Sequence, residues 1–276
     1  MAKITASDVN ALRKKTGAGM MDCKKALVEA DGDIDGAIEI LRKKGQKVAA
    51  KRGDNEASEG LTVSMAKEDN SSGVIITVNC ETDFVAKNSE FSDFVHELAS
   101  LALENNANSV DALKALEMDG LKVDEKLTEQ IGKIGEKIEV SQLGHITAES
   151  VVAYNHPGNQ IASLVGLNKS GGEALEAGKD VAMQIAAMNP VSLDKDSVPA
   201  DVVEKELEIA KDLIRQEGKP EEMVDKIATG KLNKFFKENT LLDQAFIKDN
   251  KKSVSQYLNE TEKGLTVTEF LRFSLS

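Results

Sequence analysis

The sequence predicts an α+β protein assembled from several small modules. Its 276 residues correspond to about two domains or several smaller units. The composition favours helices, because a chain that is 41% hydrophobic and 30% charged contains only 20 Gly and 4 Pro. The spacing of apolar residues changes along the chain from a helical period to the alternation of strands and back again. These observations favour a mixed fold and exclude a disordered chain.

Residues 1–45 are expected to form a three-helix module. A capping box that begins at Thr5 starts the first helix, and a Gly-rich stretch ends it. The second helix follows over 20–30. Asp33 caps the third helix, which ends in basic residues that suit the helix dipole, and Gly45 is expected to stop it.

Residues 46–59 lack a steady apolar period and are expected to form a linker that is helical at most at its start. The first core subdomain then spans 60–137. Two strand-like runs, 61–65 and 74–80, are separated by polar turn residues, which is a hairpin signal. An amphipathic helix capped by Ser89 follows.

The second core subdomain is expected over 138–199 and 239–276. The order of a strand pair followed by a helix occurs around 61–104 and again around 138–188, which is compatible with a duplicated subdomain. The expected elements are strands at 138–146, 150–154, 161–167 and 266–274 and helices at 174–188 and 253–259.

A helical hairpin is expected over 200–238. Its helices, 201–217 and 220–237, are joined by Gly218-Lys219-Pro220, which places Gly after the first helix and Pro at the start of the second. Each helix has one apolar face. Such an arm either packs on the body or projects from it as a coiled coil.

Composition excludes several kinds of protein. A net charge of -12 leaves no overall basic surface for nucleic acid, and 4% aromatic residues without Trp offer little for base stacking. Cys23 and Cys80 are isolated, so neither a disulfide framework nor a zinc site is expected. No apolar run approaches a membrane span and no signal peptide is evident. We expect a cytoplasmic protein that binds neither nucleic acid nor membrane directly.

Catalytic motifs are missing from the sequence. No phosphate-loop, dinucleotide, zincin or hydrolase elbow pattern occurs. His96, His145 and His156 lack neighbouring ligands or nucleophiles and are better interpreted as structural. Cys80 and His96 could form a nucleophile and base, but a buried cysteine at a strand end is the commoner arrangement.

Two apolar segments stand out because they fall outside the expected cores. Residues 19–21 contain adjacent methionines, which cannot both face one small core. Residues 82–85 carry Phe84 in the connection between a strand and a helix. Either Phe84 is a buried loop anchor and Asp83 a helix cap, or this segment is a wedge that inserts into a partner.

Both segments belong to longer motifs that carry a resemblance. The motifs are TGAGMMDCKKAL at 16–27 and NCETDFVAKN at 79–88. They closely resemble the two signatures of the bacterial translation elongation factor Ts family. The resemblance extends through the turn at 218–220 and residues 270–273, and it therefore covers nearly the whole chain.

The resemblance implies a ubiquitin-associated-like three-helix module, two related α+β core subdomains and a hairpin used in dimerisation. It implies a guanine-nucleotide exchange factor for elongation factor Tu that catalyses no bond chemistry and needs no cofactor. In the family, an Asp-Phe pair enters the GTPase domain and disturbs the Mg²⁺ site and phosphate loop. On this chain the pair is Asp83 and Phe84, flanked by Thr82 and Val85.

The other partner contacts of the family match four further positions. Leu12, Met20 and Met21 correspond to an apolar patch that grips a helix of the GTPase domain. His156 corresponds to a residue on the phosphate-loop side of the interface, and its interpretation as a structural turn residue stays open. Several family members continue into a C-terminal helical module that touches the partner, whereas this sequence stops at Ser276, so contacts from such a module are in doubt.

The charge is unevenly distributed. Residues 1–52 contain 12 Lys+Arg and 7 Asp+Glu, a net charge of +5, which leaves -17 for the rest of the chain. We expect the basic module to steer toward an acidic patch on the GTPase. Two other functions stay open: a binding protein that does not accelerate nucleotide release, and an enzyme, which would require an exposed and reactive Cys80.

Overall fold

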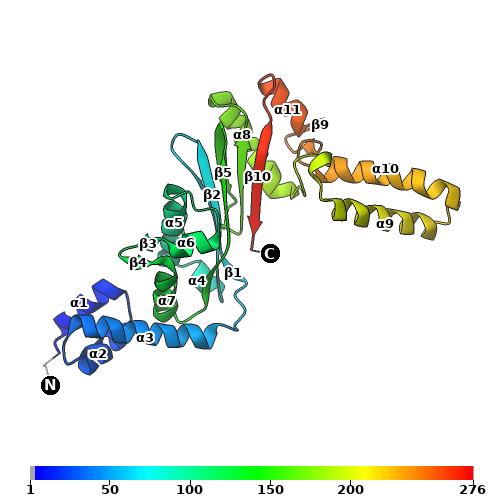
Figure 1. Ribbon diagram of the computed structural model, residues 1–276. Coiled ribbons are helices and arrows are strands. Elements are labelled where there is room, and N and C mark those ends of the chain that lie inside the picture. Colours follow the sequence, from blue (N-terminus) through cyan, green and yellow to red (C-terminus); the bar gives the residue numbers. More distant parts are fainter. Residues whose placement is uncertain (1–3, 276) are drawn as a thin grey trace. The chain divides into compact units, whose positions relative to one another are not determined.

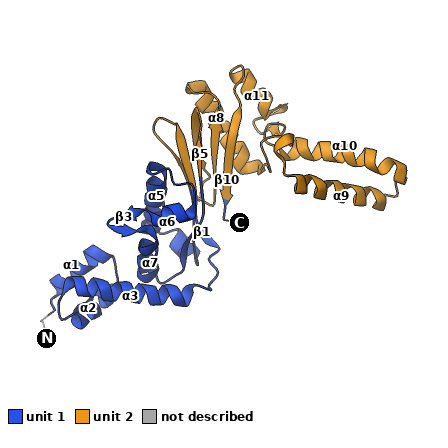
Figure 2. Cartoon of the chain, in the orientation of Figure 1, with its two compact units in different colours: residues 1–63, 76–144, 274–276 blue, residues 64–75, 145–273 orange. Residues whose placement is uncertain are grey.

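The computed structural model describes residues 4–275 and confirms the α+β class (Figure 1). The described chain divides into two compact units, coloured separately in Figure 2. Unit 1 contains residues 4–63, 76–144 and 274–275, and unit 2 contains 64–75 and 145–273. No helix among the described residues is long and apolar enough to cross a membrane.

The first three helices of unit 1 form the expected module. They are α1 (Ala6–Thr16), α2 (Met20–Glu29) and α3 (Ile34–Arg52). The capping box at Thr5 is present, and Gly17 ends α1 in the left-handed conformation at φ 64°. The buried core of the module consists of Val9, Leu12, Cys23, Ala26, Leu27 and Ala37.

The third helix does not end at Gly45, so the predicted helix end was wrong. Helix α3 continues to Arg52, and Gly45 lies within it at the point where α3 crosses α7 (Val123–Ile134). A Cβ atom on Gly132 of α7 would lie 2.7 Å from the Gly45 Cα atom, and one on Gly45 would lie 3.0 Å from the Thr128 carbonyl oxygen. Gly45 therefore permits close helix packing, and does not act as a helix stop.

A three-stranded sheet follows the module. Its strands pair in the order β1 (Glu59–Ala66), β2 (Ser72–Cys80) and β5 (Ile138–Thr147). Residues 138–144 belong to unit 1, whereas the second subdomain was expected to begin at residue 138. Strand β5 is far from β2 in sequence but pairs with it, which a pattern of alternating residues does not reveal.

Short and long helices complete unit 1. Helix α5 buries a continuous apolar face that includes Phe91, Phe94 and Leu98, and its cap is Asn88 where Ser89 was expected. The elements after β2 are α4 (Asp83–Ala86), α5 (Ser89–Glu104), α6 (Val110–Ala115), β3 (Glu117–Met118), β4 (Leu121–Lys122) and α7.

Unit 2 repeats the order of a strand pair followed by a helix. Strands β6 (Ser150–Asn155) and β7 (Ile161–Leu167) are antiparallel, and β10 (Val267–Ser274) flanks β7. Helix α8 (Gly172–Met188) packs on β6 and β7, and a Cβ atom on Gly178 would lie 2.7 Å from the Val152 side chain. The remaining elements of this subdomain are the 3-10 helix η1 (Lys195–Ser197), β8 (Ala245–Phe246), β9 (Asp249–Ser253) and α11 (Val254–Thr261).

The helical hairpin is present within two residues of the expected bounds. Helices α9 (Ala200–Gln216) and α10 (Glu221–Asn239) pack on each other, and Gly218 makes the turn at φ 73°. Figure 1 shows the hairpin extending away from the sheet of unit 2. Its own small core consists of Ala210, Ile214, Val224 and Ala228.

The close crossing of α3 and α7 is testable with Gly132→Ala. We expect the variant to weaken the packing of these helices by about 1–3 kcal/mol, because the added methyl meets backbone atoms. Native-state hydrogen exchange of the α3 and α7 amides measures this change.

Gly230→Ala is the matched control, since a Cβ atom there meets nothing within 4 Å in α10. It should stabilise its helix by about 0.5–1 kcal/mol and leave α3 and α7 unchanged. Equal protection of α3 and α7 in Gly132→Ala and the unmodified protein would contradict the close-crossing interpretation.

Candidate functional site

The segment that carries Phe84 is a single helical turn between a strand and a longer helix. Strand β2 ends at Cys80, and Thr82 caps α4 by accepting a hydrogen bond from the Val85 amide at 3.4 Å. Within three residues a second cap, Asn88, starts α5. The two closely spaced turns leave the Phe84 ring 83% exposed, the highest value of any large apolar side chain in residues 4–275. The interpretation of Phe84 as a buried loop anchor is therefore wrong.

Asp83 lies beside Phe84 at the start of α4. Its carboxylate forms an ion pair with Lys87 at 2.6 Å, and the hydrogen bond from Lys87 lowers the pKa of Asp83. The side-chain cap of α4 is Thr82, so the alternative role of Asp83 as the helix cap is not observed. Asp83 is ionised at neutral pH and half-exposed next to an exposed ring.

Two carboxylates that were not predicted from the sequence hold residues 81–82, the start of this segment. Glu136 accepts hydrogen bonds from the Thr82 amide at 3.1 Å and from the Thr82 hydroxyl at 2.7 Å. Glu81 accepts one from the Lys137 amide at 2.6 Å. Glu81 is part of the NCETDFVAKN motif, but its partners are distant in sequence, and no local pattern identifies them.

Phe84 and Val85 line an open groove within unit 1. Residues from α1, the α1–α2 turn and the end of α7 also line this groove. Lys133 of α7 pairs with Glu90 at 2.7 Å, and its aliphatic stem lies against Gly17. The other lining residues are Asn10, Arg13, Lys14, Ala18, Gly19, Asn88 and Ile134.

Two methionines are exposed at the start of α2. Met20 is 54% and Met21 is 63% exposed, which agrees with the expectation that they do not belong to the module core. Leu12 differs from them, because it is completely buried among the three helices. The expectation that Leu12 is a surface contact is therefore corrected: Leu12 packs the module from inside.

The histidines show no catalytic arrangement. His156 lies in the turn after β6 in unit 2, where its Nδ1 atom is 3.1 Å from the Tyr154 hydroxyl. His145 is half-buried, and burial lowers its pKa, which favours the neutral ring. His96 is exposed and its Nδ1 atom contacts the Ser92 carbonyl oxygen at 2.7 Å.

Cys80 is buried at the end of β2 and its thiol donates to the Thr82 carbonyl oxygen at 3.3 Å. Burial, followed by the negative charge of Glu136, raises the pKa of Cys80 to about 12. The thiolate that a nucleophile requires is thus strongly disfavoured.

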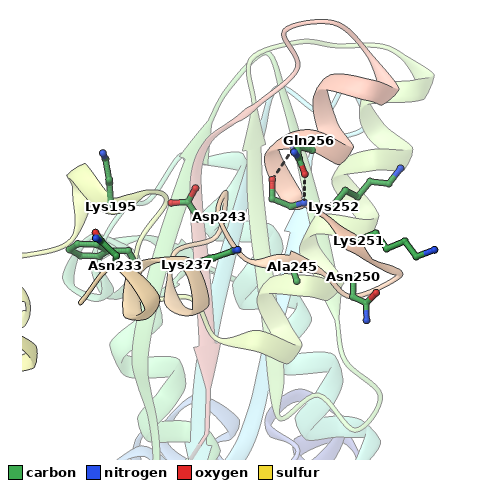
Figure 3. Close-up of a pocket in the computed structure, with 11 residues that line it drawn as sticks. Lys195, Asn233, Lys237, Asp243, Ala245, Asn250, Lys251, Lys252 and Gln256 are labelled. Atoms are coloured by element: carbon green, nitrogen blue, oxygen red, sulfur yellow. Dashed lines mark hydrogen bonds between the residues drawn. The ribbon is translucent and has the colours of Figure 1, made fainter. Parts of the chain in front are cut away.

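A second pocket lies in unit 2 at the base of the hairpin and contains none of the expected site residues (Figure 3). Lys195, Lys237, Lys251 and Lys252 line it. Lys252 already pairs with Glu260 at 2.6 Å, and Figure 3 shows Lys195 and Lys251 directed away from each other. These lysines therefore do not converge on one point. Within the described residues no group of three or more His, Cys, Asp or Glu is arranged to hold a metal ion.

Comparison with known proteins identifies the class. A family profile described as "Elongation factor TS" matches residues 81–276. An elongation factor Ts of Christiangramia forsetii is 57% identical over 275 residues and covers all of both chains. Those of Amoebophilus asiaticus and Flavobacterium psychrophilum are 53% and 51% identical, covering 98% and 100% of both chains.

These matches define a translation elongation factor of protein biosynthesis. More narrowly, the chain belongs to the elongation factor Ts family.

The state of Cys80 is testable by thiol labelling. In the native protein we expect Cys80 to be unreactive toward an aromatic disulfide reagent at neutral pH, because a pKa of about 12 in place of 9.0 lowers its thiolate fraction. Peptide mapping distinguishes Cys80 from Cys23. Labelling as fast as in the unfolded protein would restore the nucleophile hypothesis.

Proposed function

We propose that this chain is a guanine-nucleotide exchange factor that binds elongation factor Tu in its GDP form, acts in the cytoplasm and catalyses no bond chemistry. Family membership supports the partner. The observation that carries the mechanism is the 83% exposure of Phe84 on a short helical turn. An aromatic ring at such a position contributes most when a partner buries it.

In this proposal, Asp83 and Phe84 insert into the GTPase domain, with Thr82 and Val85 supporting them. Mg²⁺ requires near-ideal octahedral geometry and bridges the GTPase to the nucleotide phosphates. A small displacement of its ligands therefore weakens GDP binding. Because coupling between two ligands is reciprocal, GDP weakens the exchange factor by the same ratio, which makes the ternary complex transient.

The N-terminal module supplies a second contact in this proposal. Met20 and Met21 are flexible, exposed and adjacent, which suits an adaptable apolar contact with a helix. The net charge of +5 in residues 1–52 favours approach to an acidic surface. We propose His156 as a further contact from unit 2, where its ring is exposed in a turn.

We also propose that the hairpin mediates a homodimer. Its two helices bury one apolar face against each other but leave Ile209, Leu213 and Met223 between 43% and 46% exposed. A second hairpin could cover these side chains as in other helical pairs.

The wedge is tested with the double variant Asp83→Ala/Phe84→Ala. We expect it to fold normally, because Phe84 is exposed and Asp83 half-exposed, and to lose at least about tenfold in stimulated GDP release, as expected for removal of an aromatic hot spot. Release of a fluorescent GDP from elongation factor Tu in stopped flow measures this rate.

Ile247→Ala is the matched control, since Ile247 is exposed and lies in neither proposed contact. Unchanged stimulation by the double variant would eliminate the wedge mechanism. A native chain that binds the GTPase without accelerating release would favour the binding-protein hypothesis over exchange.

The dimer is tested by light scattering at micromolar concentration. The native chain should have twice its monomer mass of 29.7 kDa, and Ile209→Lys/Leu213→Lys should be monomeric because each added charge would be desolvated in the interface. Met188→Lys, an exposed apolar position outside the hairpin, should leave the dimer intact. A monomeric native chain would contradict the proposal.

A further inference from the structure

Hydrogen bonds between two dipeptides, residues 81–82 and residues 136–137, attach the segment that carries Phe84 to the rest of unit 1. Residues 81–82 follow β2, and residues 136–137 lie between the end of α7 and the start of β5. Strands β2 and β5 are neighbours in the sheet. The two dipeptides are therefore adjacent in space, although they are 54 to 56 residues apart in the chain.

The hydrogen bonds between these dipeptides run in both directions. Glu136 accepts from the amide and the hydroxyl of Thr82, and Glu81 accepts from the amide of Lys137. Each dipeptide thus supplies one carboxylate and at least one donor to the other. We refer to this arrangement of Glu81, Thr82, Glu136 and Lys137 as the carboxylate clasp.

We propose that the carboxylate clasp preorganises the Phe84 segment for insertion into its partner, and that Glu136 is its main positioning residue. The inference rests on the proposed exchange function. Glu81 and Glu136, the two carboxylates of the clasp, do not themselves contact the GTPase in the proposed exchange function.

Glu136 acts on the residue that starts α4. The hydroxyl of Thr82 has two functions at once: it donates to Glu136 at 2.7 Å and accepts from the Val85 amide at 3.4 Å. The second carboxylate oxygen of Glu136 fixes the Thr82 amide at 3.1 Å. Hydrogen bonds to an ionised carboxylate are shorter and stronger than neutral ones. Glu136 thereby fixes both the direction of the chain as it enters α4 and the orientation of the capping hydroxyl.

Glu81 links the same segment to the N-terminal module. Besides Lys137, its carboxylate accepts from the Arg52 guanidinium at 2.8 Å and from the Asn55 side-chain amide at 3.0 Å. Arg52 is the last residue of α3, the helix that crosses α7 at Gly45. The hydrogen bond from the Lys137 amide lowers the pKa of Glu81, so the carboxylate stays ionised at neutral pH. The stability that this lowering provides is lost only as the pH falls through the acidic range.

The other polar contacts of the Phe84 segment are local. The Cys80 thiol donates a weak hydrogen bond to the Thr82 carbonyl oxygen at 3.3 Å. The Asp83–Lys87 ion pair is largely exposed and joins residues four positions apart, and such pairs contribute little. Phe84 itself is 83% exposed and has little packing to restrain it. Without the clasp, binding would have to order this segment, at a cost of about 1–2 kcal/mol for each residue fixed. The clasp removes that cost before the partner is met.

The test compares Glu136→Ala and Glu136→Gln with the native chain. Glu136→Ala removes both hydrogen bonds to Thr82. Glu136→Gln retains an acceptor for one donor, but its amide group presents a donor to the other, so its effect should be intermediate. Glu139→Ala is the matched control, because among the described residues Glu139 pairs with Lys137 at 3.3 Å and forms no hydrogen bond with residues 81–82.

The first measurement is hydrogen exchange of the free protein, which does not depend on the proposed function. Glu136→Ala should exchange the amides of residues 82–86 roughly tenfold faster, which corresponds to the loss of about 1.4 kcal/mol of local protection. Protection of α5 and α8 should be unchanged. Unchanged exchange over residues 82–86 would overturn the clasp.

The second measurement is stimulated GDP release over a range of exchange-factor concentrations. Glu136→Ala should lower the maximal rate about tenfold and change the half-saturating concentration less than about threefold, because Met20 and Met21 still dock. A maximal rate equal to that of the native chain, despite faster local hydrogen exchange, would overturn the positioning role.

The two proposals fail in different ways. If the native chain does not accelerate GDP release, the exchange function is wrong, while hydrogen exchange still decides whether the clasp orders the segment. If Glu136→Ala loses protection throughout unit 1, Thr82→Val replaces it, since that change removes only the hydroxyl and nearly conserves volume. Thr82→Val should then accelerate exchange locally at residues 82–86, and failure to do so would refute the proposal.

Discussion

The structure of unit 1 depends on the backbone contact between α3 and α7 at Gly45 and Gly132. Neither residue has a side chain, so the two helices approach more closely than side chains would allow. Helix α3 belongs to the N-terminal module, and α7 leads directly into the clasp and β5. The contact therefore sets the groove that lies between α1 and the Phe84 segment. The exposed methionines of α2 and the exposed ring of α4 are held by one connected set of helices.

An exposed aromatic ring is a liability in a monomer, because it favours nonspecific association. Here the ring is carried by a single helical turn that has little apolar packing of its own. Charged and polar contacts restrain the segment at its stem: Thr82 to Glu136, and Glu81 to Lys137, Arg52 and Asn55. The Phe84 ring is therefore free to contact a partner, while the polar contacts of Glu81 and Thr82 hold the segment in position. This arrangement also explains why the stem contains carboxylates whose hydrogen-bonding capacity is used within the protein.

The positive charge of residues 1–52 and the rigidity of the Phe84 segment act on different steps of the proposed exchange cycle. The excess of basic residues in 1–52 acts over distance, weakens with ionic strength and affects the encounter with the GTPase. The clasp orders the Phe84 segment before the encounter, and in this proposal the benefit is realised in the next step, when Phe84 enters the partner. The hairpin contributes to neither step in this account, because its exposed apolar stripe is suited to a second copy of the chain.

Features that depend on neighbouring residues could be predicted from the sequence: the capping box at Thr5, the strand pair of unit 2, the hairpin turn at Gly218 and the motif that contains Phe84. Four other features became evident in the folded chain: α3 continues through Gly45, β5 pairs with β2, Leu12 is buried and Glu136 binds Thr82. The physical reason is the range of the interactions. Caps and turns are closed within about four residues. Helix crossings, strand neighbours and the clasp join residues tens of positions apart, whose partners no local pattern identifies.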